Sequence, residues 1–145
     1  MSKIVNISQA ASIAIHSLAI IASRREKLNA KQLANLTDSS ANHLSKVMQL
    51  LVKNGYLVSN RGPTGGFMLN RPAEEITLLE VYELIEGAVE CKICGIAEDK
   101  CPFVSCVFGS SAEIFTEEFT TYLRTTRISD LTTKNTLYVS ENHSN

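Results

Sequence analysis

The sequence predicts a mainly α-helical fold with a small β-wing, built as a helical domain followed by a long helix near the C-terminus. Three observations support this fold class. Apolar residues recur at helical spacing through most of residues 8–54. A glycine-rich stretch at residues 60–66 separates two short runs of strand-forming residues. Residues 110–123 carry one apolar stripe, which is typical of a helix packed on one side only.

Three helices are predicted before the glycine-rich stretch. The first covers residues 8–23, begins with Ser8 as its N-cap, and is buried, because apolar residues occur on nearly every side of it. The second opens with Asn29 and Gln32, the two members of a capping box. A turn at residues 37–40 precedes the third helix, which continues until Asn54 and Gly55 stop it.

The glycine-rich stretch predicts a hairpin. Residues 56–59 and 67–69 have strand composition and flank it, so the order of elements is helix, turn, helix and two-stranded hairpin. Two helices joined by a turn of about four residues match the helix-turn-helix pattern. With the hairpin added, residues 1–76 are predicted to form a winged helix-turn-helix domain.

Two further helices are predicted after the hairpin. Thr77 and Glu80 form a capping box for a fourth helix that Gly87 closes, and Ser110 with Glu113 is read as another box for the long helix. The apolar stripe of that helix needs a surface to cover it, and a second subunit is favoured over its own domain. We expect residues 77–131 to hold the dimerisation helices and residues 132–145 to form a flexible tail. The stripe consists of Phe115, Phe119, Tyr122 and Leu123.

The charge of the chain is divided between its two halves. Residues 1–71 contain nine basic and two acidic residues, whereas the remainder contains five basic and thirteen acidic ones. A basic half suggests that the first part of the chain meets a polyanion. No apolar run is long enough for a membrane span and no signal peptide is evident, so a cytosolic protein is expected. No sequence motif of a conventional enzyme occurs.

The third helix and the hairpin loop supply the candidate contacts to double-stranded DNA. Asn and Lys side chains can pair with base edges in the major groove, and serines more often contact phosphates. An arginine at the tip of a thin glycine-rich loop can enter the minor groove. These candidates are Ser39, Ser40, Asn42, His43, Ser45, Lys46, Arg61, Gly62 and Gly65.

All four cysteines fall within residues 91–106, with the spacing C-x2-C-x6-C-x4-C. Four thiolates can complete an iron-sulfur cluster or a tetrahedral zinc site. The compact spacing favours the cluster, held by Cys91, Cys94, Cys101 and Cys106, because structural zinc sites usually separate their cysteine pairs more widely. A zinc-stabilised DNA-binding protein and a thiol-redox or electron-transfer protein using C-x-x-C remain as alternatives.

The chain resembles bacterial winged-helix transcription regulators of the IscR and NsrR type, the Rrf2 family. The resemblance extends over about residues 3–131 and depends on the loop at 61–66 with Phe67, the stretch 71–77, the helix end at Glu86 and Gly87, and the cysteine loop before a long helix. It implies a homodimeric regulator, in the expected case a repressor. In such regulators the third helix reads the major groove, the wing arginine enters the minor groove, and a loop cluster senses redox state, nitric oxide or cluster supply.

The cysteine loop departs from the pattern of that family. Cluster-bearing members typically offer three cysteines and a non-cysteine ligand from the first helix, where this chain has Ala10. The resemblance makes Cys94, Cys101 and Cys106 the usual three and leaves Cys91 as the candidate fourth ligand. His16 is the competing ligand, although a histidine on a buried helix is more often a hydrogen-bonded core residue. Both [2Fe-2S] and [4Fe-4S] clusters are compatible with four cysteines.

Overall fold

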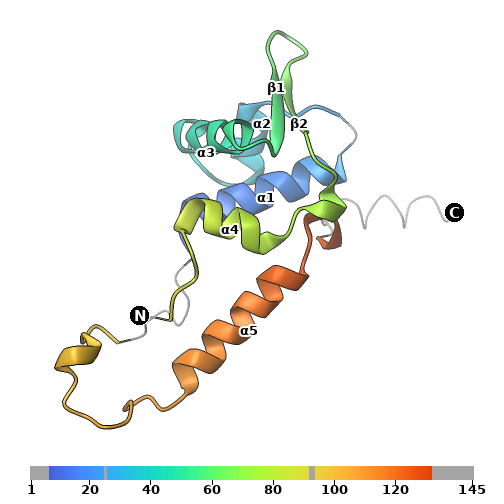
Figure 1. The fold of residues 1–145 in the computed structure, drawn as a ribbon. Helices are drawn as coiled ribbons and strands as arrows, with labels where there is room; N and C mark the ends of the chain where they lie inside the picture. Colours follow the sequence, from blue (N-terminus) through green and yellow to red (C-terminus); the bar gives the residue numbers. More distant parts are fainter. Residues whose placement is uncertain (1–6, 25, 92–93, 132–145) are drawn as a thin grey trace, which may run out of the picture.

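A computed structural model describes residues 7–24, 26–91 and 94–131 of the 145-residue chain (Figure 1). It confirms the mainly helical fold with one two-stranded antiparallel wing. Three single turns of 3-10 helix complete these ranges, at Ala73–Glu75, Glu98–Lys100 and Ile128–Asp130. The main elements are α1 (Gln9–Ser23), α2 (Ala30–Leu36), α3 (Ala41–Lys53), β1 (Leu57–Asn60), β2 (Gly66–Leu69), α4 (Leu78–Glu86) and α5 (Ser111–Thr125).

Helix α1 lies at the centre of the hydrophobic core. The Ser8 hydroxyl accepts a hydrogen bond from the Ala11 amide at 3.1 Å, so the predicted N-cap is confirmed. Leu18 and Ala14 are fully buried, and α3 and α4 both pack on this helix. His16, by contrast, is exposed, and its Nδ1 lies 2.7 Å from the Ser12 carbonyl oxygen. The expectation that His16 is a core residue is therefore wrong, because it lies on the side of α1 that no other described element covers.

Helices α2 and α3 form the helix-turn-helix. The predicted capping box is present, since Asn29 Oδ1 accepts from the Gln32 amide and Gln32 Oε1 accepts from the Asn29 amide, both at 2.9 Å. Asp38 adopts a positive φ of 50° in the turn, a conformation that an aspartate tolerates better than most residues. Helix α3 ends at Lys53, and Gly55 follows with φ of +81°, as its position after the helix predicted.

The wing is a hairpin whose register runs from Leu57 opposite Leu69 to Asn60 opposite Gly66. One side of it is attached to the segment between α1 and α2. The Phe67 amide donates to the Leu28 carbonyl oxygen at 2.8 Å. A Cβ at Gly66 would lie 2.7 Å from that same oxygen, so only glycine permits this close approach.

Helix α4 begins and ends as the sequence predicts. The Thr77 hydroxyl accepts from the Glu80 amide, the Glu80 carboxylate accepts from the Thr77 amide, and Gly87 closes the helix with φ of +84°. The chain then leaves the body of the molecule as the cysteine loop and returns along α5 (Figure 1).

The capping box predicted for α5 is wrong. Ser110 precedes the helix with φ −88° and ψ 7°, which is not the extended conformation of an N-cap, and its side chain makes no capping hydrogen bond. A turn sets the start of the helix instead, since the Ser111 amide donates to the Phe108 carbonyl oxygen. Only the C-terminal half of α5 is anchored in the core, where Leu123 is buried and the Phe119 ring meets Tyr82 edge to face at 5.6 Å.

The segment after α5 is tied to the segment between the wing and α4. The Leu78 amide donates to the Thr126 carbonyl oxygen, and the Ile128 amide donates to the Ile76 carbonyl oxygen, both at 2.9 Å. Ile128 and Ile76 are both fully buried in the core that also contains α1. One core therefore spans the predicted boundary between residues 76 and 77. The tail predicted for residues 132–145 lies outside the described residues.

Candidate nucleic-acid interface and cysteine loop

Helix α3 has one buried face and one exposed polar face. Leu44, Met48 and Leu51 are fully buried against the other helices. On the opposite face the exposed residues follow a spacing of four, three and four positions, which places them in one row along the helix. We call this row the α3 stripe. It consists of Asn42, Lys46, Gln49 and Lys53.

The predicted residues at the start of α3 divide into two groups. Asn42 and Lys46 belong to the α3 stripe, with His43 and Ser45 half-buried beside it. The hydroxyls of the other two serines hold the turn. Ser40 Oγ accepts from the His43 amide at 3.1 Å as the N-cap of α3, and Ser39 Oγ lies 2.8 Å from Thr37 Oγ1. Their lone pairs and protons are thus partly committed to the local fold before any ligand binds.

Two members of the α3 stripe, Gln49 and Lys53, are absent from the sequence-based candidates. The candidates predicted from the sequence for α3 lie only in the turn before the helix and in its first turns. The missing signal was the spacing, because residues 42, 46, 49 and 53 fall between the apolar positions that define the buried face. The exposed polar face of α3 therefore extends further than its first two turns.

The wing tip presents Arg61 on a turn that glycine shapes. Gly62 has φ of +107°, and the Gly65 amide donates to the Gly62 carbonyl oxygen at 2.9 Å. A Cβ on Gly65 would lie 2.3 Å from the Asn60 carbonyl oxygen, so no other residue fits this turn. Arg61 itself is exposed and its guanidinium appears in none of the described ion pairs.

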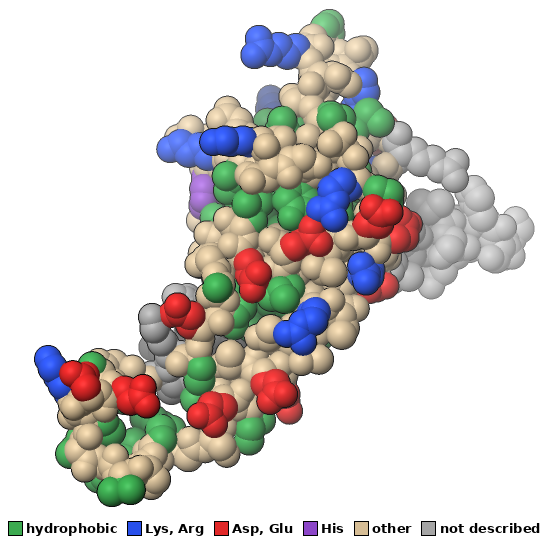
Figure 2. Space-filling model, viewed as in Figure 1, with side chains coloured by type: hydrophobic (Ala, Val, Ile, Leu, Met, Phe, Trp, Pro, Cys, Tyr) green, Lys and Arg blue, Asp and Glu red, His purple; other side chains and the backbone are tan. Residues whose placement is uncertain are grey.

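The wing and the helix-turn-helix lie at the same end of the molecule, and the cysteine loop lies at the other end (Figure 1). Figure 2 shows Lys and Arg side chains around the wing and the neighbouring helices, whereas Asp and Glu side chains predominate along α5 and the loop. The division of charge along the sequence is thus also a division in space. The end that carries α3 and the wing suits a polyanion.

The cysteine loop holds four free thiols. Cys91, Cys94 and Cys106 are exposed and Cys101 is half-buried, and none of them forms a disulfide. A single 3-10 turn at Glu98–Lys100 stands between Cys94 and Cys101. Within the described ranges, no three Cys, His, Asp or Glu side chains lie close enough together to hold a metal ion. The four potential metal ligands are thus close together in the sequence, but the described ones do not meet at a common point in space.

The same loop exposes a group of large apolar side chains. The Val104 side chain is fully exposed to solvent, and four other large apolar side chains of the loop are more than half exposed. Isolated exposed apolar residues are ordinary, but a cluster within thirteen residues of one loop is not. The described residues of the loop, 91 and 94–110, include no buried side chain. The cluster comprises Ile96, Phe103, Val104, Val107 and Phe108.

Among the described residues, no helix has the length and apolar character needed to span a membrane.

Comparison with known proteins assigns the family. The family Rrf2, described as iron-dependent transcriptional regulator, matches residues 7–134. Protein aau3 of Rhizobium meliloti is 33% identical over 121 residues, which cover 81% of this chain and 79% of that protein. The transcriptional regulator IscR of Cereibacter sphaeroides is 28% identical over 117 residues, or 75% of this chain and 72% of the regulator.

A solved structure supports the fold. CymR, the global cysteine regulator of B. subtilis, superposes with a TM-score of 0.70 at 20% identity, covering 88% of this chain and 95% of CymR. The winged-helix architecture is therefore that of known regulators, and the absence of enzyme motifs agrees with the regulatory family. The chain belongs to the Rrf2 family of winged-helix, DNA-binding transcriptional regulators.

Proposed function

We propose that this regulator is a cytoplasmic homodimer that binds an operator through α3 and the wing, acts as a repressor, and holds an iron-sulfur cluster in its cysteine loop. The proposal of DNA binding is supported by one observation: the α3 stripe and Arg61 lie together at the basic end of the molecule. An α-helix fits the major groove of B-DNA, and a thin loop beside it can follow the minor groove.

Each candidate has a role that follows from its chemistry and position. Asn42 and Lys46 face outward from α3, where an amide can pair with adenine and an ammonium with guanine or a phosphate. The half-buried His43 and Ser45 flank them, and Ser39 and Ser40 at the turn suit phosphate contacts that fix register. On the wing, Gly62 and Gly65 keep the loop thin enough for Arg61 to approach the minor groove.

The DNA contact is tested with an operator fragment selected from random sequence. Replacing Arg61 by Ala should weaken binding about tenfold and reduce the slope of log affinity against log salt, because one cationic contact is lost. Lys100→Ala is the control, since it removes one positive charge from the cysteine loop. Equal affinities and equal salt slopes for Arg61→Ala and the wild type would contradict the wing contact.

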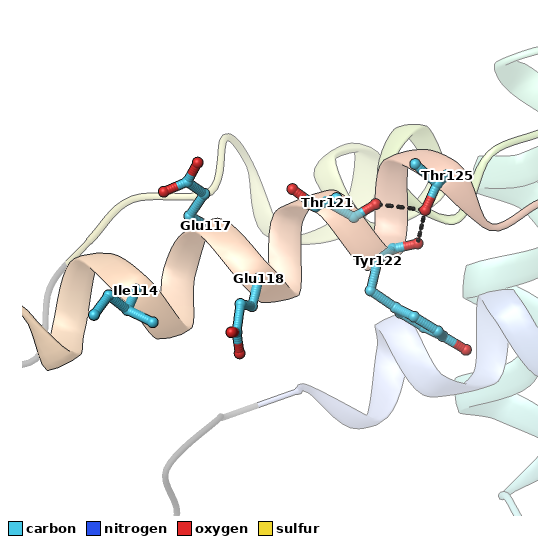
Figure 3. A pocket seen from close by; sticks show the side chains of 6 residues that line it. All are labelled: Ile114, Glu117, Glu118, Thr121, Tyr122 and Thr125. Atoms are coloured by element: carbon cyan, nitrogen blue, oxygen red, sulfur yellow. Dashed lines mark hydrogen bonds between the residues drawn. The ribbon is translucent and has the colours of Figure 1, made fainter.

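A second copy of the chain is proposed to cover the outer face of α5. Figure 3 shows a groove on that face lined by residues of α5 alone. Its apolar members Ile114 and Tyr122 are 49% and 56% exposed. The hydroxyls of Thr116, Thr120 and Thr125 donate to carbonyl oxygens of the same helix, so these three need no water when the helix is covered. Arg124 of a second, antiparallel helix would supply a cation for the acidic Glu117 and Glu118 of the groove.

The cysteine loop fits an iron-sulfur cluster in donor number and kind. Four thiols within one loop, all free and at least partly exposed, are the ligand set that such clusters use. Because the described residues do not already assemble a site, Cys91, Cys94, Cys101 and Cys106 must close around the inorganic core. A bound cluster supplies redox and nitric oxide chemistry at this loop. Reducing conditions in the cytoplasm keep the thiols available as ligands.

Helix α4 connects this loop to the DNA-binding end. Gly87 opens the loop at one end of α4, and the helix packs on α1. A loop that packs differently when its thiols are ligated would change how α5 packs on α4 and α4 on α1. In a dimer, that change would alter the distance between the two DNA-binding ends. The cluster-bound or the cluster-free dimer binds more tightly, depending on which of them has the distance between DNA-binding ends that matches the operator half-sites.

The cluster is tested on protein purified without oxygen, by visible absorption and by iron and acid-labile sulfide content. Cys91→Ala should abolish or strongly reduce the cluster, whereas Ser105→Ala, a change of similar size between Cys101 and Cys106, should leave it intact. A complete cluster in Cys91→Ala would overturn that ligand assignment and direct attention to His16 on the exposed side of α1. Colourless protein with one zinc ion would favour the zinc-stabilised alternative.

A further inference from the structure

The base of the wing is closed by a stacked pair of side chains. Tyr56 directly precedes β1, and Arg71 follows two residues after β2. The Asn70 amide donates to the Tyr56 carbonyl oxygen at 2.9 Å, which extends the hairpin ladder to its base. The Arg71 guanidinium carbon lies 5.2 Å from the centre of the Tyr56 ring, within the range of a cation–π contact.

Glu80 joins this pair to the first turn of α4, and its two oxygens have different partners. Oε1 accepts hydrogen bonds from the Tyr56 hydroxyl, at 3.0 Å, and from Arg71 Nη1. Oε2 accepts from the Thr77 amide at 3.0 Å and from the Thr77 hydroxyl at 3.2 Å. One carboxylate thus caps α4 with one oxygen and holds the wing with the other. We call Tyr56, Arg71 and Glu80 the wing clamp.

The surroundings of the wing clamp favour a charged and well-fixed Glu80. Tyr56 is buried, and the side chains of Arg71 and Glu80 are only about one third exposed. Burial acts to raise the pKa of Glu80, but the hydrogen bonds from Thr77, Arg71 and Tyr56 outweigh it, so the pKa is lowered overall. Charge-assisted hydrogen bonds in a partly buried site hold geometry better than an exposed ion pair.

The wing needs such a clamp because it is small. Two strands of four residues have little stability of their own. In the described structure the wing clamp attaches the base of the hairpin to Glu80, and the Phe67 amide attaches the loop-side half of β2 to Leu28. Arg61 lies on the loop beyond the last strand pair, so a change in how the clamp holds the base of the hairpin also shifts Arg61.

We propose that Glu80 is a positioning residue for operator binding, which holds the wing at the angle that lets Arg61 reach the minor groove. The proposal rests on the proposed DNA contact of Arg61. It gives Glu80 no contact with DNA, and it assigns Tyr56 and Arg71 the task of transmitting the position of α4 to the wing.

A double-mutant cycle between Glu80 and Arg61 tests the proposal. Glu80→Gln keeps the size of the side chain and a capping oxygen but removes the charge that pairs with Arg71. Glu83→Gln, an exposed carboxylate on the same helix, is the matched control. We expect about a fivefold loss of operator affinity for Glu80→Gln, none for Glu83→Gln, and no further loss when Glu80→Gln is added to Arg61→Ala.

The cycle separates failure of this inference from failure of the proposed function. If Arg61→Ala weakens binding but Glu80→Gln has no effect, or the two losses multiply, Glu80 does not act through Arg61 and the inference is overturned. If Arg61→Ala does not change operator affinity, both the proposed wing contact and this inference are wrong. Tyr56→Phe provides a second variant, which removes one hydrogen bond to Glu80 while preserving the core, and it should show the same non-additivity with a smaller loss. Thermal unfolding of each variant confirms that the fold is retained.

Discussion

The winged-helix end and the α5 arm of this protein differ in how they bury their apolar residues. At the winged-helix end, α1, α2 and α3 cover one another, and Leu44, Met48 and Leu51 are fully buried. In the arm, the cysteine loop and the N-terminal half of α5 leave Val104, Phe108 and Phe115 in solvent. The first region buries its core within the single chain, and the exposed apolar residues of the second fit our proposal that a second subunit and a ligand cover it.

The largest effect on operator affinity is expected from a substitution that disrupts the proposed dimer contact of α5. Tyr122→Glu replaces an apolar side chain by a third carboxylate beside Glu117 and Glu118 in the groove of α5, and we expect it to convert a dimer into a monomer of 15.9 kDa in sedimentation equilibrium. Operator affinity should fall about a hundredfold, because two linked half-site contacts become one.

Glu113→Ala is the matched control for the dimer. It alters the same helix nine residues earlier, on the side opposite Tyr122, so mass and affinity should stay at wild-type values. A Tyr122→Glu variant that remains dimeric and binds DNA normally would mean that the outer face of α5 is not the interface, and the contrast between the two regions would need another explanation.

A smaller effect is expected from the wing clamp as the pH is lowered. The folded-state pKa of Glu80 lies below its ordinary value, so its carboxylate adds stability above that ordinary value and loses it as the pH falls through the lowered pKa. Glu80→Gln should therefore be less stable than the wild type at neutral pH, by about 1 kcal/mol at most because the site is partly solvated, and the difference should shrink in acid. Denaturant unfolding at pH 7 and at pH 3 to 4 measures it, and a difference that grows in acid would contradict the assignment.

The smallest effect is expected inside α1. Ser17 is fully buried and its hydroxyl has no hydrogen-bond partner among the described residues. Replacement by Ala removes an unsatisfied polar group of similar size, so the free energy of unfolding should rise by about 0.5 kcal/mol. A clear loss of stability in chemical denaturation would indicate that the hydroxyl has a partner, such as a buried water.

Sequence reasoning predicted the winged-helix end well because its signals are local. The capping boxes at Asn29 and Thr77 and the glycines at 55 and 87 each act within a few residues, and each occurs where expected. The predicted box at Ser110 failed because the preceding turn, rather than the serine side chain, sets the backbone there.

The features that could not be predicted from the sequence are contacts between residues far apart in the chain. The apolar composition of α1 did not reveal which side would stay open, so His16 was assigned to the core. The wing clamp joins Tyr56 to Glu80 across twenty-four residues, and no spacing rule connects them. The cysteine spacing identified the donors, but their arrangement depends on a ligand that the chain alone does not provide.

In the proposed function, ligation of the cysteine loop controls DNA binding. Its most direct test measures operator affinity, at one salt concentration and without oxygen, for a single preparation before and after the cluster is removed. We expect cysteine-ligated iron and sulfide in the first sample and an affinity change of about tenfold or more between the two. Equal affinities in a sample that fully loses its iron and sulfide, or full operator affinity in protein isolated without iron, would contradict it.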